Sequence, residues 1–352
     1  MAAGGDGAGR DGVLSERGVV TGVAGLIGPH LARALLEKGH EVVGVDDLSQ
    51  GRRVNLASCV EHPSFRFHEA DVRDLGSMER LTAGASTLVH LAALKIPRYT
   101  GYLATLEVNG RGTEVVLECA RRHGARMLFA STDDVYGKNP DPRFSEESTL
   151  VLGDSKINRW ASAVSKVYGE HLCFAYAESH GVPVSIVRYS GIYGPTYQLS
   201  RLSGPQDIFI HAALTDQPMP IHGDGTQTRP FAHVSDAVEA TLRVLEAPYA
   251  EGEVVNVGAA DHLSIVNLAY LVWRLAGART RPRLRFVPYT DFSRGYEDPR
   301  QRTVDIGKAE CLLGWRPRID VGEGMRRQVE WFREHLEEIR QANPGFTLED
   351  ER

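Results

Sequence analysis

Cysteine is scarce in this sequence, which has four cysteines among 352 residues. Cys59, Cys119, Cys173 and Cys311 lie far apart along the chain, and no two of them form a C-x-x-C pair. Small disulfide-stapled domains and structural zinc sites need closely spaced cysteines. The sequence therefore argues against both, and it favours a reducing cytoplasm as the compartment.

Long hydrophobic runs are also missing. No apolar stretch approaches the roughly 18 residues that a membrane-spanning helix needs, and residues 87–94 are apolar enough only for one buried strand. The start, MAAGGDGAGRDG, has acidic residues and glycines where a secretory signal would have a basic end and an apolar run. We expect residues 1–16 to be a disordered tail.

The chain has no excess of positive charge. Lys and Arg number 40 against 46 Asp and Glu, which gives a formal net charge of −6. Nucleic acids and anionic membranes are bound through a basic face, so neither is expected as a partner. A length of 352 residues is enough for two domains of about 150 residues each.

Short apolar stretches alternate with amphipathic ones through the first half of the chain. The predicted strands are residues 18–21, 41–45, 64–68, 87–91, 126–130 and 184–189, and predicted helices span 29–38, 105–123 and 160–179. Strands joined by helices of this length form a parallel sheet that is covered on both faces. The sequence therefore predicts an α/β fold with a doubly wound, Rossmann-type parallel sheet.

A glycine-rich turn follows the first predicted strand. Gly22, Gly25 and Gly28 form a G-x-x-G-x-x-G pattern, which lets a pyrophosphate lie against the backbone at a helix N-terminus. Asp46 ends the second strand, where a carboxylate can accept both ribose hydroxyls, and the Asp46-Asp47 pair would repel a 2′-phosphate. The pattern predicts NAD rather than NADP. The alternative is an ordinary strand-to-helix turn with a capping aspartate.

The second half of the chain changes character. Residues 191–230 are rich in Gly, Pro and polar residues, whereas 263–275 and 321–339 have helical periodicity. We assign residues 17–189 to an NAD-binding Rossmann domain, to which part of 231–262 returns. Residues 190–230 and 263–340 are assigned to a smaller α/β substrate-binding domain, and 341–352 to a second tail.

Several motifs in a fixed order make the chain resemble the extended short-chain dehydrogenase/reductase family of nucleotide-sugar epimerases, dehydratases and decarboxylases. The resemblance runs from about residue 19 to 331. Its motifs are the three glycines, Asp71-Val72, His90-Leu91-Ala92-Ala93, S-T-D-D-V-Y-G at 131–137, Lys166, Tyr193-Gly194-Pro195, G-D-G-T-Q-T-R at 223–229 and L-G-W-R-P at 313–317. Residues 150–166 look most like the bacterial 4-epimerases and the UDP-glucuronate decarboxylases.

The resemblance implies a set of NAD contacts around the glycine turn and the ends of the next strands. These residues are Gly22, Ala24, Gly25, Leu26, Ile27, Gly28, Asp46, Asp47, Leu48, Ser49, Asp71, Val72, Leu91, Ala92, Ala93 and Lys166. Asp71 is the residue expected at the adenine, and Lys166 the one expected at the nicotinamide ribose.

The catalytic pattern of the family is present except for one residue. The resemblance implies that Thr132 binds the reacting sugar hydroxyl, and that a tyrosine four residues before Lys166 takes its proton as hydride passes to NAD. Ser162 stands at that position. A phenol has an ordinary pKa of about 10, whereas an aliphatic hydroxyl is much less acidic and its oxygen lies nearer the backbone. Serine therefore cannot replace the phenolate directly.

Three interpretations of Ser162 stay open. A water bridged by Ser162 reaches the substrate, or another group such as Asp133, Asp134 or a nearby tyrosine is the base, or the enzyme is impaired, for example by a change made to trap a complex. In dehydratases of the family, Asp-Glu follows the threonine as acid and base. The Asp133-Asp134 pair can do acid–base chemistry, or one of its carboxylates caps the following turn.

Arginines are the main candidates for the substrate. Arg229 resembles the arginine that grips the nucleotide diphosphate, although Pro230 replaces the usual aspartate, and Arg302 is the second diphosphate candidate. Gly191 replaces an asparagine of many relatives, which can widen the pocket. Further candidates at the carboxyl edge of the sheet are Lys95, Arg98 and Tyr99. For each of these charged residues, a solvated surface side chain is the alternative.

The sequence predicts an NAD-dependent nucleotide-sugar epimerase that works through a transient keto-sugar. The alternatives are a 4,6-dehydratase or UDP-glucuronate decarboxylase of the same family, and a catalytically silent protein that binds NAD and a sugar nucleotide. The thirteen histidines show no metal-ligand spacing, so no metal is expected. The resemblance also implies a homodimer through the helices at 105–123 and 160–179.

Overall fold

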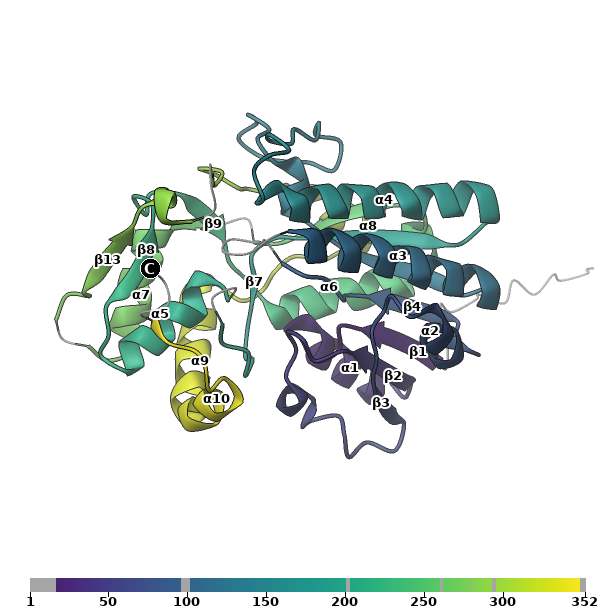
Figure 1. The fold of residues 1–352 in the computed structure, drawn as a ribbon, viewed down its shortest axis with the longest axis horizontal. Helices are drawn as coiled ribbons and strands as arrows, with labels where there is room; N and C mark the ends of the chain where they lie inside the picture. Colours follow the sequence, from purple (N-terminus) through teal and green to yellow (C-terminus); the bar gives the residue numbers. More distant parts are fainter. Residues whose placement is uncertain are drawn as a thin grey trace, which may run out of the picture.

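A seven-stranded parallel sheet forms the centre of the larger part of the molecule (Figure 1). The computed structural model describes residues 17–95, 102–200, 203–259, 262–278, 280–292 and 296–348. The strand order is β11-β6-β5-β4-β1-β2-β3. The bounds are β1 Arg17–Thr21, β2 Glu41–Asp46, β3 Phe65–Glu69, β4 Thr87–His90, β5 Arg126–Thr132, β6 Val184–Tyr189 and β11 Val254–Val257. The predicted doubly wound fold is confirmed.

Helices cover both faces of this sheet, and each face has its own apolar core. One face carries α1 (Ile27–Glu37), α6 (Val234–Glu246) and α8 (Gly307–Leu313). The other carries α2 (Leu75–Thr82), α3 (Leu103–His123) and α4 (Trp160–His180). Strand β6 is buried along its whole length, as a strand covered on both faces must be.

The order of the strands places a crevice between β1 and β4. The chain runs from β1 to β2 and β3 on one side and then returns to β4 on the other. Ligands of open α/β sheets bind outside the carboxyl ends of the strands at such a reversal. Here the turn after β1 meets the segment after β4, since a Cβ added to Gly22 would lie 2.6 Å from the Ala92 nitrogen. Only glycine fits this close approach.

A smaller part of the molecule packs around a third core. It contains α5 (Pro205–Leu214), α7 (Ile265–Leu275), α9 (Val321–Glu334), α10 (Leu336–Ala342) and the paired strands β8 (Met219–His222) and β13 (Leu284–Val287). Two short pairs join it to the sheet: β7 (Ile192–Tyr193) with β10 (Ala232–His233), and β9 (Thr228–Pro230) with β12 (His262–Ser264). The 3₁₀ helices are η1 Arg53–Leu56, η2 Asp133–Tyr136, η3 Pro248–Ala250 and η4 Tyr289–Asp291.

The helix predicted over residues 321–339 is two helices, α9 and α10. Asp320 begins α9, because its carboxylate accepts the N–H groups of Gly322 at 2.9 Å and Glu323 at 3.0 Å. His335 interrupts the helix with φ −113° and ψ 16°. Its ring nitrogen Nδ1 lies 2.9 Å from the Trp331 carbonyl oxygen, and its own N–H is 3.1 Å from the same oxygen. A side chain that competes for a helical carbonyl favours such a break.

The domain division that we predicted differs from the packing in two places. Val304, Leu313 and Trp315 belong to the core of the parallel sheet, although residues 263–340 were assigned to the substrate-binding domain. Residues 341–348, expected to be part of a tail, pack on the smaller core. Leu348 is buried there, and its carbonyl oxygen accepts a hydrogen bond of 2.9 Å from Arg285.

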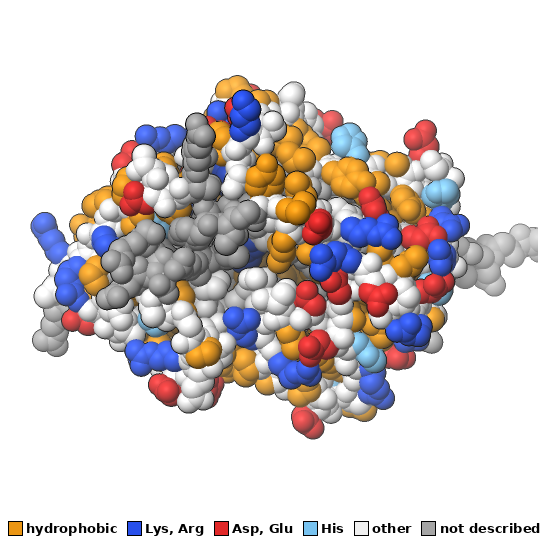
Figure 2. Space-filling model, in the orientation of Figure 1, with side chains coloured by type: hydrophobic (Ala, Val, Ile, Leu, Met, Phe, Trp, Pro, Cys, Tyr) orange, Lys and Arg blue, Asp and Glu red, His pale blue; other side chains and the backbone are white. Residues whose placement is uncertain are grey.

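The surface mixes charges of both signs. On the face shown in Figure 2, Lys and Arg side chains are interspersed with Asp and Glu. None of the helices in the described ranges is long and apolar enough to cross a membrane. No cluster of three His, Cys, Asp or Glu side chains that could hold a metal ion occurs among the described residues.

The packing of the C-terminal segment gives a stability prediction. Leu348 is 5% exposed and Leu103 is 66% exposed. We expect Leu348→Ala to lower the free energy of unfolding by about 2–3 kcal/mol, because it leaves a cavity in the smaller core. Leu103→Ala, the matched control, should change it by no more than about 0.5 kcal/mol. Urea denaturation of both variants measures this, and equal effects would mean that residues 341–348 do not pack.

Candidate functional site

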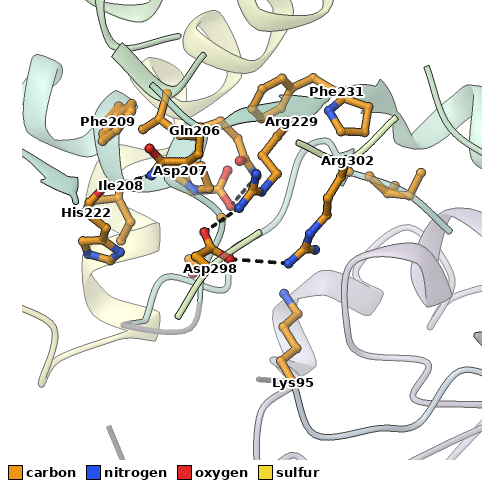
Figure 3. Close-up of a pocket in the computed structure, with 18 of the residues that line it drawn as sticks. Lys95, Gln206, Asp207, Ile208, Phe209, His222, Arg229, Phe231, Asp298 and Arg302 are labelled. Atoms are coloured by element: carbon orange, nitrogen blue, oxygen red, sulfur yellow. Dashed lines mark hydrogen bonds and ion pairs between the residues drawn. The ribbon is translucent and has the colours of Figure 1, made fainter. Parts of the chain in front are cut away.

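Two adjoining cavities lie at the carboxyl ends of the strands. The larger has a volume of about 400 Å³ and is lined by the glycine turn, the end of β2, the segment after β4, and the ends of β5 and α4. The smaller, of about 220 Å³, lies between α5, β8, strand β9 with Arg229, and the loop that carries Arg302 (Figure 3). Leu26, Lys95, Asp133, Gly191, Ile192 and Gln198 line both cavities. A ligand in one cavity therefore meets a ligand in the other at these residues.

The structure brings nearly all the predicted site residues to these two cavities. The larger is lined by Gly22, Gly25, Leu26, Ile27, Gly28, Asp46, Asp47, Ser49, Val72, Leu91, Ala92, Ala93, Lys95, Thr132, Asp133, Asp134, Ser162, Lys166 and Gly191. Arg229 and Arg302 line the smaller. Ala24, Leu48 and Asp71 lie outside both linings, and Arg98 and Tyr99 lie outside the described residues.

The glycine turn and Asp46 fit a dinucleotide. Helix α1 begins after Leu26 without a side-chain cap, so its first N–H groups can bind a pyrophosphate. Asp46 Oδ2 accepts the Ala24 N–H and Oδ1 accepts the Leu48 N–H, both at 2.9 Å. These bonds fix the carboxylate at the wall of the larger cavity, although burial raises the pKa of Asp46. The roles of Ala24 and Leu48 are thus to hold Asp46 through the backbone.

Asp71 is held by its own neighbour. Arg73 forms a two-pronged ion pair with the Asp71 carboxylate, with nitrogen–oxygen distances of 3.0 and 2.5 Å. Ala70 and Val72 on either side of it line the larger cavity. At the rim of the cavity, Asp47 Oδ1 accepts the N–H of Ser49 at 3.0 Å and its hydroxyl at 2.7 Å.

Lys166 and Ser162 lie one turn apart on α4 and face the larger cavity. The Lys166 ammonium donates a hydrogen bond of 2.6 Å to the carbonyl oxygen of Ala130 on β5. Burial lowers the pKa of Lys166 to about 8. Ser162 is 6% exposed. The helix thus presents the Ser162 hydroxyl to the cavity one turn before Lys166.

A hydrogen-bonded chain that the sequence did not indicate ties this turn of α4 to the loop after β4. The Asn109 side chain on α3 binds the backbone of Leu94, at 2.7 Å to its N–H and 3.1 Å to its carbonyl. It also donates to Ser165 Oγ at 2.9 Å, and that hydroxyl donates to the Ser162 carbonyl at 2.7 Å. The chain positions Ser162 relative to Lys95, which follows Leu94.

Asp133 and Asp134 have different partners. Ser190 donates a hydrogen bond of 2.6 Å to Asp133 Oδ2, and the Thr132 hydroxyl lies 3.3 Å from Asp133 Oδ1. Asp134 Oδ1 accepts from Arg302 at 2.7 Å and from Arg159 at 3.0 Å. Asp133 is therefore held mainly by neutral hydroxyls, whereas Asp134 is held by two cations.

These partners move the two pKa values in opposite directions. Burial raises the pKa of Asp133, and Arg302, 3.6 Å away, offsets this only in part. Burial acts on Asp134 as well, but the guanidinium groups of Arg302 and Arg159 outweigh it and lower the pKa of Asp134 below its usual value. Asp134 is therefore the more easily ionised of the two, and Asp133 takes up a proton at the higher pH.

The hydroxyls of two neighbouring tyrosines are held in hydrogen bonds to other residues. The Tyr189 hydroxyl pairs with Thr241 Oγ1 at 2.6 Å, and burial raises the pKa of Tyr189. The Tyr136 hydroxyl donates to Asn256 at 2.7 Å and accepts from Arg188 at 3.0 Å. Burial raises the pKa of Tyr136 to about 12. Neither phenol is suited to act as the base.

The substrate side contains charged residues that sequence reasoning missed. Arg159 is fully buried between Asp134 and Asp298, and Asp298 also pairs with Arg229 and Arg302. The available signals were the placement of Asp298 four residues before Arg302, and of Arg159 directly before α4. Neither pattern predicts a contact without the fold, because the partners come from distant parts of the chain.

Gly191 and Pro230 depend on each other. Gly191 has φ +61°, and a Cβ added there would overlap the carbonyl oxygen of Pro230. A residue with a side chain therefore cannot occupy this position while Pro230 keeps its place. Gly191 lines both cavities, so the wall between them is backbone here.

The sequence is similar to those of a known family of enzymes. A model of the NAD dependent epimerase/dehydratase family matches residues 19–258. UDP-N-acetyl-alpha-D-glucosaminuronate decarboxylase from Bacillus cytotoxicus is 33% identical over 334 residues, which cover 91% of this chain and 99% of the relative. The dTDP-glucose 4,6-dehydratase of Streptomyces niveus is 32% identical, with 90% and 93% covered.

The fold is also similar to the folds of solved enzymes. UDP-glucuronic acid 4-epimerase from Bacillus cereus, in complex with UDP-glucuronic acid and NAD, matches with a TM-score of 0.81 and 27% identity over 90% of this chain and 99% of that one. A dTDP-glucose 4,6-dehydratase from Streptomyces venezuelae with NAD bound has a TM-score of 0.81 and 29% identity, with 93% and 100% covered. The chain belongs to the NAD dependent epimerase/dehydratase family of nucleotide-sugar enzymes, and NAD is its cofactor.

Proposed function

We propose that this protein is a nucleotide-sugar epimerase that inverts one ring carbon through a transient ketone. The observation that carries the proposal is the meeting of the two cavities at Asp133 and Gly191, beside Thr132 and Lys166. A sugar nucleotide with its diphosphate near Arg229 and Arg302 extends its sugar toward this junction. Lys166 and Thr132, which line the larger cavity beside this junction, would hold the nicotinamide end of NAD there.

The chain's own residues hold the reactants in this scheme. NAD, when bound, would supply reversible hydride transfer. Lys166 would hold its nicotinamide ribose, and Asp46 would hold its adenosine ribose. Thr132, at the end of β5, binds the hydroxyl of the carbon that is oxidised.

The proton of that hydroxyl leaves through Thr132 to Asp133. Thr132 Oγ1 accepts the proton of the sugar hydroxyl and passes its own proton to Asp133 Oδ1, 3.3 Å away. The same two transfers run backwards when the ketone is reduced. Asp133 fits this role because burial raises its pKa toward neutrality. Ser162 then needs no ionised hydroxyl, and Asp134 acts as the fixed counter-ion of Arg302 and Arg159.

A second candidate is decarboxylation of a nucleotide uronate through the same ketone. The relative from Bacillus cytotoxicus is named as a decarboxylase of this kind. Arg302 lines the smaller cavity within 3.6 Å of Asp133, where it can hold a sugar carboxylate. The two reactions differ in product mass, because only decarboxylation loses carbon dioxide.

The quaternary structure is also a proposal. We propose a homodimer through α3 and α4, as the family resemblance implies. Val164, Tyr168 and Phe174 on α4 are 41%, 43% and 39% exposed, and burial of such apolar side chains favours association.

The cysteine usage supports the cytoplasm as the compartment.

Turnover tests the proposed function directly. We expect the purified protein, incubated with UDP-glucose, UDP-N-acetylglucosamine, UDP-glucuronic acid and dTDP-glucose, to convert one of them into an isomer of unchanged mass, identified by mass spectrometry and NMR. Loss of carbon dioxide would instead establish the decarboxylase. The variant Ser162→Tyr, which restores the phenol beside Lys166, should keep or raise the rate. Absence of turnover in both proteins would favour the silent binding role.

The proton route predicts a pH dependence. A base must be ionised, so kcat should fall as pH falls through the raised pKa of Asp133. Asp133→Asn should lower kcat by about 10²–10⁴-fold and remove this acid limb. A decline above the Lys166 pKa of about 8 should remain. In the control Asp134→Asn the acid limb should persist, and its loss there would assign the base to Asp134.

The cofactor preference gives a third test. Asp46→Asn should weaken NAD binding by about tenfold, because bonds to a charged acceptor are stronger than those to an amide. NADP binding should weaken less, since a repulsive charge is removed. The control Asp141→Asn, an exposed residue outside both cavity linings, should leave the NAD dissociation constant within about twofold, which calorimetry on cofactor-free protein can measure. Unchanged NAD affinity in Asp46→Asn would rule out the ribose contact.

A further inference from the structure

Asp298 occupies the anion-binding wall of the smaller cavity. It follows the described residues Tyr296 and Glu297 and lines this cavity together with Arg229 and Arg302. Figure 3 shows its carboxylate joined to both of those arginines by dashed lines. Its side chain is 18% exposed, so the carboxylate lies at the inner surface and not in bulk solvent.

Three guanidinium groups from separate elements converge on this carboxylate. Arg229 on β9 pairs with Asp298 Oδ2. Arg159, next to the start of α4, lies 3.2 Å from Oδ1, and Arg302 lies 3.5 Å from the same oxygen. Both carboxylate oxygens are thus engaged by cations, in the manner of a bound anion.

Arg229 differs from the other two arginines in what else it binds. Arg159 and Arg302 are also bonded to Asp134, whereas the described partners of the Arg229 guanidinium are Asp298 and the carbonyl oxygen of Thr228. A phosphate that enters the cavity can therefore take Arg229 without breaking the pairs on Asp134. It must, however, replace the carboxylate that already holds this guanidinium.

We infer that Asp298 is an internal competitor for the diphosphate of the substrate, which exchanges with this carboxylate at Arg229 on binding. The inference rests on the proposed function, because a nucleoside diphosphate sugar is the ligand. Without ligand, Asp298 keeps a buried guanidinium paired and the arginines in place. With ligand, the two anions share one cationic wall, and their repulsion sets the affinity below what the arginines alone would give.

Neutral replacement of Asp298 separates competition from a scaffold role. Asp298→Asn keeps an oxygen that can accept from Arg229 but removes the repelling charge. We expect it to bind inorganic pyrophosphate and UDP about tenfold more tightly than the wild type, a change of about 1.4 kcal/mol. Uridine, which carries no phosphate, should bind both proteins equally. Isothermal titration calorimetry on the NAD-loaded proteins measures all three ligands.

The control is Asp291→Asn, which removes the same charge from an exposed residue of η4 outside both cavity linings. It should bind pyrophosphate and UDP like the wild type. Equal or weaker binding of both ligands by Asp298→Asn would overturn the inference, since Asp298 would then be a scaffold that stays in place. If thermal melting shows that Asp298→Asn is unfolded, Asp298→Ser serves as the second neutral variant, and unfolding of both would equally overturn it.

These outcomes are independent of the reaction. Tighter pyrophosphate and UDP binding in the neutral variant, without turnover of any sugar nucleotide, would support the inference and reject the epimerase. Turnover by the wild type, with unchanged affinities in Asp298→Asn, would support the enzyme and reject the competitor.

Discussion

The buried cluster of three arginines and three aspartates is the interaction on which the geometry of the site depends. Arg159, Arg229 and Arg302 meet Asp133, Asp134 and Asp298 at the junction of the two cavities. Removing one partner of a buried ion pair typically costs about 3–5 kcal/mol, because the other charge stays buried without compensation. The members come from η2, β9, the start of α4 and the loop before α8. The cluster therefore fixes the smaller part of the molecule against the parallel sheet.

The same cluster gives two adjacent carboxylates different chemistry. Asp134 is surrounded by guanidinium groups that hold it ionised, whereas Asp133 points to Ser190 and Thr132 and is left mainly with the desolvation penalty. A difference of one pKa unit corresponds to about 1.4 kcal/mol of differential interaction. Two neighbouring carboxyl groups of the same residue type can therefore have different pKa values, because their hydrogen-bond and ion-pair partners differ.

Local sequence signals predicted the cofactor half of the site because each signal is complete within a short segment. The glycine turn, Asp46 and the Lys166 helix follow from strand and helix periodicity and from the order of the parallel strands. Helix α5 was missed, because Pro205 and the following apolar run stand in a Gly- and Pro-rich region. Asp298 and Arg159 were missed because their partners are distant in sequence, and the burial of Leu348 has no local signature at all.

The departures from the family pattern lie near one another in space. Ser162 and Gly191 both line the larger cavity, and Gly191 must lack a side chain because the carbonyl of Pro230 occupies that space. The family resemblance predicts a tyrosine and an asparagine at these two positions. In the proposed route Thr132 and Asp133 move the proton, and the hydroxyls of Tyr136 and Tyr189 are held in other hydrogen bonds. In the mechanism that we propose, Asp133, whose pKa is raised by burial, takes the acid–base role that the family resemblance gives to a tyrosine.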